Sequence, residues 1–174
     1  MVSADRGLAR KSAQRILSEF GVKKAPVPVE RIIKSKNIIL EYAPLDSELS
    51  GMAYIKDNVA IIGLNALHHP NRQRFSAAHE LGHHELHSDE LQKSIHVDKG
   101  IRVLARDELS AEGIDKREIE ANTFAAELLM PSGLILEALD VEGLDIEDDA
   151  SVEKLANKFR VSASAMRFRL ASLF

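Results

Sequence analysis

The sequence contains no cysteine among its 174 residues. This absence excludes disulfides, thiolate zinc sites and a cysteine nucleophile, so any metal must be bound through nitrogen and oxygen ligands. A chain without cysteine also fits a reducing compartment. Long apolar runs are missing too, since none approaches the roughly 18 residues of a membrane span. We therefore expect no membrane association.

An excess of positive charge is also absent, because the formal net charge is -4 and the isoelectric point is about 6.0. This balance argues against a protein that coats nucleic acid. Residues 1–20 carry charges throughout and lack the apolar centre of a signal peptide, so no secretory signal is expected. With 45% hydrophobic residues, the chain is long enough for one core and a small appendage. Together these features predict a soluble, cytoplasmic protein.

Strand patterns come early in the chain and helix patterns come late, which predicts an α+β fold. Runs of β-branched residues predict strands over residues 37–44 and 51–65. Asp57 and Asn58 interrupt the second run and suggest a hairpin, although a single buried strand over its second half is the simpler interpretation. Helical patterns cover residues 4–20, a short stretch after Pro28, and residues 71–87, 115–130 and 151–174. Residues 88–113 are mixed and charged, and predict a loop with short helical pieces.

The most informative stretch is HELGH, residues 79–83, inside one of these helical patterns. His79 and His83 are four residues apart, so a helix places both side chains on one face with their Cβ atoms roughly 5–6 Å apart. Two imidazole nitrogens can then reach one ion at the Zn–N distance of about 2.0–2.1 Å. Glu80 points about 100 degrees around the helix from His79, where it can reach a water held on the metal. This is the geometry of the HExxH motif of zinc peptidases, with two ligands and a general base on one turn.

Each part of the motif has a chemical role. A catalytic zinc ion keeps three protein ligands and leaves one position open for water. Its charge lowers the pKa of that water from about 15.7 toward about 7 and polarises the scissile carbonyl. Glu80 accepts the proton and later delivers it to the leaving amine. The sequence leaves open which residue assists at the oxyanion, with His87 and Tyr54 as candidates.

A solvated helical face rich in histidine is the alternative explanation, and His84, Glu85 and His87 fit such a face. The apolar residues around the motif favour a metal site instead. Gly82 costs roughly 1 kcal/mol in a helix relative to alanine, so we expect a strand or a substrate to pass close to it. The remaining histidines of interest are assigned to loops or the surface: His68, His69 and His96.

A catalytic zinc site needs a further ligand, which in a chain without cysteine should be His, Asp or Glu. Glu118 continues the apolar stripe that predicts the buried face of the helix over residues 115–130, whereas Glu120 and Glu127 point to its solvated side. The stripe consists of Ala121, Ala125, Leu128 and Leu129. A buried carboxylate needs a partner charge, so we expect Glu118 to be the third ligand, with Glu120 as the alternative. The alternative is that Glu118 has a purely structural role, as a carboxylate near the start of its helix that is stabilised by the helix dipole. Asn122 is a candidate for orienting a ligating histidine through its other ring nitrogen.

The stretch RQRFSAAHELGHHELH, followed by EIEANTFAAELLMP, resembles the ImmA/IrrE family of metallopeptidases, which are of the HExxH-plus-glutamate (gluzincin) type. The resemblance runs from Ala4 to the end of the chain, and the two motifs together are specific. It implies that His79, His83 and Glu118 bind zinc and that Glu80 is the base. It also implies the cleavage of helix-turn-helix repressors of phages, mobile elements and stress regulons, which relieves repression. Longer members carry a C-terminal sensor domain, and this chain is expected to correspond to the short form.

The segment 151–174 has the spacing of two short helices around a turn, as in a helix-turn-helix. It is locally basic, with Lys154, Lys158, Arg160, Arg167 and Arg169. DNA contact is one interpretation of this charge. We favour the other, in which the helical pair docks on the peptidase or on a repressor and an acidic hinge within residues 137–149 balances its charge. The expected domains are a zinc metallopeptidase domain, residues 1–135, and a helix-turn-helix-like appendage, residues 136–174.

The predicted fold is an α+β, zincin-like metallopeptidase with a small twisted β-sheet packed on the active-site helix. The predicted function is a zinc-dependent endopeptidase that hydrolyses a peptide bond in an XRE-type helix-turn-helix repressor. One Zn²⁺ is the expected cofactor, although Mn²⁺ or Fe²⁺ also suits nitrogen and oxygen ligands. The alternative is a non-proteolytic interaction module that sequesters its partner in a repressor or toxin–antitoxin pair. A structural zinc site usually has four protein ligands, and the three good ones evident in the sequence favour catalysis.

Overall fold

The computed structural model describes residues 4–99 and 116–174, and its element order confirms the α+β class. The helices are α1 (Arg6–Glu19), α2 (Val29–Ser35), α3 (Pro70–Leu86), α4 (Ser88–Leu91), α5 (Lys116–Leu129), α6 (Ser132–Glu142), α7 (Asp149–Phe159) and α8 (Ala163–Ala171). The strands are β1 (Ile39–Ala43), β2 (Gly51–Lys56), β3 (Val59–Asn65) and β4 (His96–Asp98). The predicted elements are present, and α6 and β4 are additions. The part of the predicted loop from residue 100 onward lies outside the described residues.

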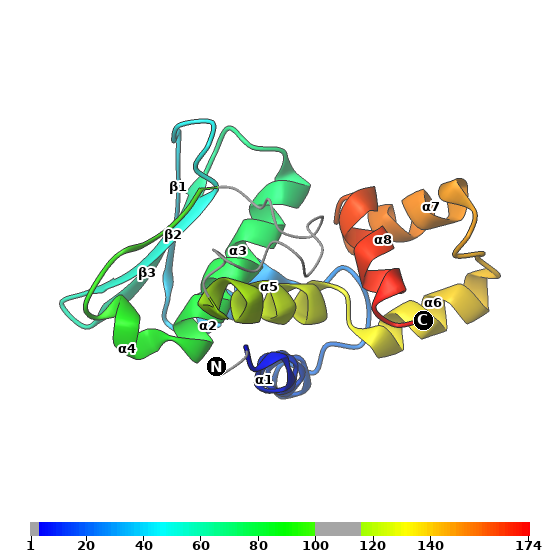
Figure 1. The fold of residues 1–174 in the computed structure, drawn as a ribbon, viewed down its shortest axis with the longest axis horizontal. Coiled ribbons are helices and arrows are strands. Elements are labelled where there is room, and N and C mark those ends of the chain that lie inside the picture. Colours follow the sequence, from blue (N-terminus) through cyan, green and yellow to red (C-terminus); the bar gives the residue numbers. More distant parts are fainter. Residues whose placement is uncertain (1–3, 100–115) are drawn as a thin grey trace.

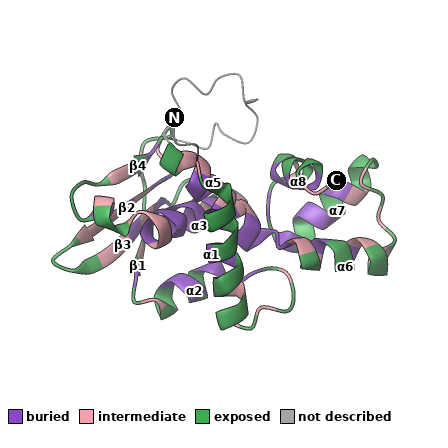
Figure 2. Cartoon of the chain, turned by 60° about the horizontal axis from the view of Figure 1, so that its bottom comes forward, coloured by how far each residue is buried: buried purple, intermediate pink, exposed green. Residues whose placement is uncertain are grey.

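The four strands form one mixed sheet in the order β1-β3-β2-β4 (Figure 1), and Figure 2 labels β4 at one edge of this sheet. β1 is parallel to β3, whereas β2 is antiparallel to both β3 and β4. The hairpin suggested by Asp57 and Asn58 is present, and these residues have φ values of 52° and 61°. Two successive left-handed residues match the twist of a tight hairpin, and aspartate and asparagine tolerate that conformation. The turn residues therefore make β2 and β3 one hairpin rather than separate strands.

Helix α3 lies at the centre, between the sheet and α5 (Figure 1). Pro70 occupies its first turn, and the His69 side chain caps it by accepting a hydrogen bond from the backbone N–H of Asn71. Residues 75–84 are buried without exception, so this helix is enclosed by protein rather than amphipathic. Enclosure of this kind removes the motif residues from bulk water.

Gly82 lies where α3 and α5 approach each other closely. A Cβ atom on Gly82 would lie 3.0 Å from Cδ1 of Phe124 and 3.2 Å from Cα of Ala121. The sequence therefore identified a close approach correctly but misidentified its partner, which is a helix rather than a strand or a substrate. The missing side chain lets the two helices that carry the motifs lie side by side.

The side of α5 that the sequence assigned to solvent is covered by α1 and by the C-terminal helices. Glu120 accepts a hydrogen bond from the backbone N–H of Asp5 at 2.7 Å. Glu127 forms an ion pair with Arg169 of α8 at 2.6 Å. Both carboxylates are buried, so their predicted solvent exposure was wrong. The apolar stripe of α5 identifies only one of its two buried faces. The other face carries charged side chains, which are buried because each has a polar or charged partner.

Helices α6, α7 and α8 form a lobe at one end of the molecule (Figure 2). α6 occupies part of the predicted acidic hinge, which is therefore helical as far as Glu142. The two helical patterns after residue 150 correspond to α7 and α8, and the turn between them contains Arg160 in the left-handed region with a φ of 53°. Asn71 of α3 donates a hydrogen bond to the carbonyl of Val161, which ties this turn to the centre of the fold. Within the described ranges, no helix has both the length and the apolar character that crossing a bilayer requires.

Candidate metal centre

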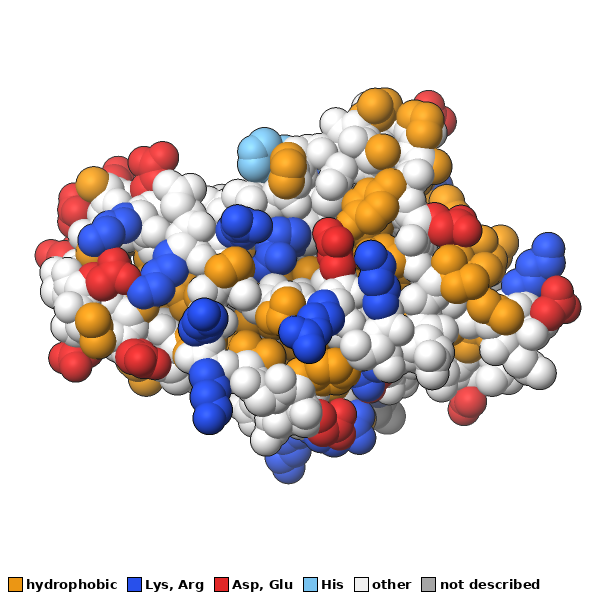
Figure 3. Space-filling view, turned by 180° about the vertical axis from the view of Figure 1, so that it is seen from behind, with side chains coloured by type: hydrophobic (Ala, Val, Ile, Leu, Met, Phe, Trp, Pro, Cys, Tyr) orange, Lys and Arg blue, Asp and Glu red, His pale blue; other side chains and the backbone are white. Residues whose placement is uncertain are grey.

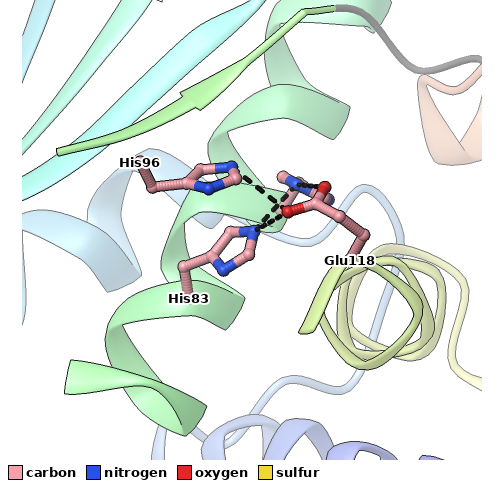
Figure 4. A group of neighbouring side chains, drawn as sticks. His83, His96 and Glu118 are labelled. Carbon is pink, nitrogen blue, oxygen red and sulfur yellow. Dashed lines mark hydrogen bonds and ion pairs between the residues drawn. The ribbon is translucent and has the colours of Figure 1, made fainter. Parts of the chain in front are cut away.

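Four side chains from three elements converge on one point: His79 and His83 of α3, His96 of β4, and Glu118 of α5 (Figure 4). One potential ligand atom from each lies within 4.8 Å of the others. The fold thus brings the three predicted ligands together, although they come from helices separated in the sequence. It also adds His96, whose predicted place in a loop or at the surface is wrong.

The spacing of the donor atoms fits one bound cation. Nε2 of His79 lies 3.2 Å from Oε2 of Glu118, and Nε2 of His83 lies 3.2 Å from Oε1 of the same carboxylate. The two Nε2 atoms are 3.1 Å apart. Ligand atoms bonded at about 2.0–2.1 Å to a tetrahedral ion lie about 3.3–3.4 Å from one another. Two imidazole nitrogens and a carboxylate oxygen at this spacing are a donor set suited to a divalent transition metal.

Asn122 orients the first of these histidines. Its side-chain oxygen Oδ1 lies 3.0 Å from Nδ1 of His79. An amide oxygen only accepts hydrogen bonds, so Nδ1 carries a proton and Nε2 is directed at the cluster. This is the contact expected of a residue that sets the tautomer and ring orientation of a metal ligand.

Glu80 is completely buried and lies against the start of β2. A Cβ atom on Gly51 would be 3.1 Å from Oε1 of Glu80, so the glycine makes room for the carboxylate. Neither carboxylate oxygen has a hydrogen-bond partner among the described residues. Burial raises the pKa of Glu80 well above its ordinary value; the positive charge of His79 opposes this, and the carboxylates of Asp98 and Glu118 add to it. A carboxylate in this environment binds a proton readily, which is what a general base requires.

The three candidate ligands shift one another's pKa values. Burial lowers the pKa of His79, but the hydrogen bond to Glu118 and the carboxylates of Glu80 and Asp98 outweigh it and raise the pKa to about 9. Burial lowers the pKa of His83 to about 3, despite its hydrogen bond to Glu118. Burial also acts to raise the pKa of Glu118, but the two histidines hold it well below its ordinary value. Because the raised pKa keeps His79 protonated at neutral pH, a cation bound here would displace that proton.

Glu120 and His87, two other sequence candidates, are not in this group of potential ligands, although the ring of His87 lies 5.6 Å from that of His83. Oε2 of Glu120, the alternative ligand, lies 3.4 Å from Nε2 of His87, so these two side chains pair with each other. Tyr54 follows Ala53, the residue paired with His96, so its side chain points to the opposite face of the sheet from His96. His84 was expected in a solvated face, but it is buried and its Nε2 lies 3.0 Å from the carbonyl oxygen of Ile61.

His96 was missed because β4 has three residues, too few for the alternation that identifies a strand. The available signal was its place between the β-branched residues Ile95 and Val97. Pairing of His96 with Ala53 of β2 then directs the imidazole into the cluster (Figure 4).

The sequence profile of the IrrE N-terminal-like domain family, Peptidase_M78, matches residues 33–171, so the chain belongs to this family of metallopeptidases. The family resemblance seen in the two motifs is thereby confirmed. A solved structure described as a Mycobacterium tuberculosis transcriptional regulator has the same fold, with a TM-score of 0.59 at 18% sequence identity. The similarity covers 95% of this chain but 46% of that one, so this chain spans less than half the length of its structural relative. No match to a curated protein is found.

Proposed function

We propose that this protein is a zinc-dependent endopeptidase with a zincin-like fold that cleaves a helix-turn-helix transcriptional repressor and so relieves repression. One observation carries the proposal: the buried carboxylate of Glu80 lies one residue from His79, beside a donor set of two imidazoles and a carboxylate. Membership of a peptidase family supports the reaction class. The shared fold with a transcriptional regulator is consistent with a regulatory setting.

The chain's own residues have separate tasks in the hydrolysis. His79, His83 and Glu118 would hold the ion, and Asn122 would keep Nε2 of His79 directed at it. When bound, the divalent cation would acidify water, polarise the scissile carbonyl and favour the ionised form of Glu80. Glu80 would accept a proton from the attacking water and deliver it to the leaving amine nitrogen.

We propose that a peptide substrate approaches along β4. In the described part of the chain β4 pairs with a strand on one side only, so its other edge can accept an extended peptide through main-chain hydrogen bonds. The side chains of His96 and Glu118 are 20% and 26% exposed, so the cluster opens on this side. Val97 alternates with His96 in β4, so its exposed side chain lies on the opposite face of the sheet from the cluster.

The C-terminal lobe is proposed to be a helix-turn-helix-like docking appendage, residues 136–174, on a peptidase domain of residues 1–135. Four of its basic residues form ion pairs with acidic ones: Lys154 and Lys158 with Glu142, Arg167 with Asp149, and Arg169 with Glu127. On the face drawn in Figure 3, acidic and basic side chains are interspersed over this lobe. Such pairing leaves little free positive charge for DNA phosphates, so a protein partner is favoured over direct DNA binding.

The substitution Glu80→Gln tests the proposed reaction. The wild-type, zinc-loaded chain is expected to cleave its cognate repressor in vitro, and the variant should cleave at least about 100-fold more slowly while still binding zinc. Gel electrophoresis with mass spectrometry of the fragments measures both the rate and the bond cut. Glu85→Gln is the matched control, since Glu85 is on the same helix and pairs with Lys36 outside the cluster.

The second candidate function, sequestration of a partner without cleavage, is favoured by one observation. His96 provides a fourth donor side chain, and structural zinc sites are usually closed by four. Repressor release that is undiminished in the Glu80→Gln variant would support sequestration and contradict the peptidase.

A further inference from the structure

His96 lies beside the candidate metal centre although it belongs to neither of the two sequence motifs. Its Nε2 atom lies 3.5 Å from Oε1 of Glu118 and 3.9 Å from Oε2 of Glu80. It therefore faces both the candidate ligands and the candidate base. A side chain in this place either completes the coordination of the ion or contacts the substrate bound to it.

Ring geometry distinguishes these two roles. Imidazoles that bind one tetrahedral ion through Nε2 have ring centres about 5 Å apart, because each centre lies about 3.2 Å from the metal. Even the 90° angles of an octahedral ion separate the centres by about 4.5 Å. The rings of His79 and His83 are 4.8 Å apart with planes at 73°, as two ligands of one ion should be. The rings of His83 and His96 are 3.7 Å apart with planes at 30°, which is closer than two ligands of one ion allow.

The surroundings of His96 leave its Nε2 atom free to bind a group that arrives from outside the protein. Its Nε2 atom is buried and has no hydrogen-bond partner among the described residues, and the same holds for both carboxylate oxygens of Glu80. A buried donor without a partner is costly, so its retention beside the base points to a partner that arrives with the substrate. The side chain is also 20% exposed, on the side from which a peptide along β4 would approach.

We propose that His96 is a further catalytic residue, whose Nε2–H donates a hydrogen bond to the scissile carbonyl oxygen as negative charge develops on it. This inference rests on the proposed peptidase function and identifies the oxyanion donor that the sequence left open. No bond to His96 forms or breaks. A single donor of this kind contributes about 10²–10³ in kcat, because it is aimed at charge that appears only in the transition state.

Co²⁺-loaded protein tests the proposal without a known substrate, with inorganic phosphate as a tetrahedral oxyanion probe. The variants are His96→Ala and His96→Gln, with His83→Ala as the control for loss of a ligand. His96→Ala is expected to keep Co²⁺ affinity, measured by chelator competition, within about threefold of wild type, and to leave the visible Co²⁺ spectrum unchanged. Its phosphate affinity should fall about tenfold or more, and His96→Gln should recover part of the loss because the Gln amide also donates.

The outcomes separate this inference from the function on which it rests. A loss of Co²⁺ affinity in His96→Ala equal to that of His83→Ala would make His96 a ligand and overturn the inference alone. Unchanged phosphate binding in His96→Ala would overturn it too. Failure of the wild-type chain to bind Co²⁺ would overturn the metal site and the peptidase proposal together. In a repressor-cleavage assay, His96→Ala should lower kcat by about 10²–10³ with little change in KM.

Discussion

Nδ1 of His79 on α3 lies 3.0 Å from Oδ1 of Asn122 on α5. This hydrogen bond joins the two helices that carry the candidate ligands. It also settles which ring nitrogen faces the cluster, since the proton on Nδ1 leaves Nε2 for the ion. The orientation of one ligand therefore depends on a residue 43 positions away in the sequence.

Replacing Asn122 should weaken metal binding without removing a ligand. We expect Asn122→Ala to lower zinc affinity by about 10–100-fold, because the imidazole of His79 loses its fixed tautomer and orientation. Asn122→Asp keeps an acceptor oxygen and should stay much closer to wild type. Competition with a chromophoric chelator measures the affinities, and equal values for the alanine variant and the wild type would contradict the orienting role.

Metal affinity should rise with pH. Burial alone would lower the pKa of His79, but the hydrogen bond to Glu118 and the nearby carboxylates outweigh burial and raise this pKa to about 9 when no ion is bound. The ring is therefore protonated at neutral pH. Each bound ion then displaces about one proton from His79, and affinity should increase about tenfold per pH unit between pH 7 and pH 9. Calorimetry in buffers of different ionisation enthalpy counts the released protons. Binding that is independent of pH in this range would show that His79 is already neutral.

The same shift predicts how the metal-free protein responds to pH. The pKa of His79 rises from 6.5 in the unfolded chain to about 9 in the fold, so its contribution to stability is complete below pH 6.5 and is lost as the pH rises through 9. Thermal unfolding of the metal-free protein between pH 6.5 and pH 9.5 measures this loss. His79→Gln, which cannot be protonated, should flatten the dependence.

Gly82→Ala should destabilise the fold although alanine favours helices. The added methyl group would lie 3.0 Å from Cδ1 of Phe124, so α3 and α5 would have to separate. We expect a net loss of about 1–3 kcal/mol in the free energy of unfolding, together with weaker metal binding, since the ligands come from both helices. Gly133→Ala on α6 is the matched control, because nothing lies within 4 Å of the Cβ position there. Gly133→Ala should increase the free energy of unfolding by up to about 1 kcal/mol. If urea unfolding showed the same change in stability for both variants, the close approach of α3 and α5 at Gly82 would be refuted.

Arg169→Met should destabilise the protein strongly. Arg169 is buried, pairs with Glu127 at 2.6 Å and donates a hydrogen bond to the carbonyl of Met130, so its loss leaves a buried carboxylate without its cation. The expected cost is about 3–5 kcal/mol. Arg167→Met removes an exposed pair with Asp149 and should cost less than about 1 kcal/mol. Urea unfolding of both variants measures the difference in their free energies of unfolding. Equal losses in the two variants would show that the Arg169–Glu127 pair does not anchor the C-terminal lobe.

The placement of the HELGH side chains could be predicted because it depends on helix geometry within five residues. His79 and His83 share a face in any α-helix, and Glu80 then lies at a set angle from them. Glu118 could be proposed from the apolar stripe of its own helix, for the same reason. The α+β class likewise follows from local periodicity. The Asp57–Asn58 turn suggested the hairpin, but a single buried strand was the favoured interpretation, because Asn-Gly or Asp-Gly would be a stronger turn signal.

Tertiary packing decided the features that depend on contacts between distant segments. Glu120 and Glu127 are buried because α1 and α8 cover a face whose own pattern looks solvated. His96 reaches the cluster only because a three-residue strand pairs with β2, and no periodicity can develop in so short an element. Periodicity shows which side of an element is apolar, whereas the partner of each side is set by how the whole chain packs.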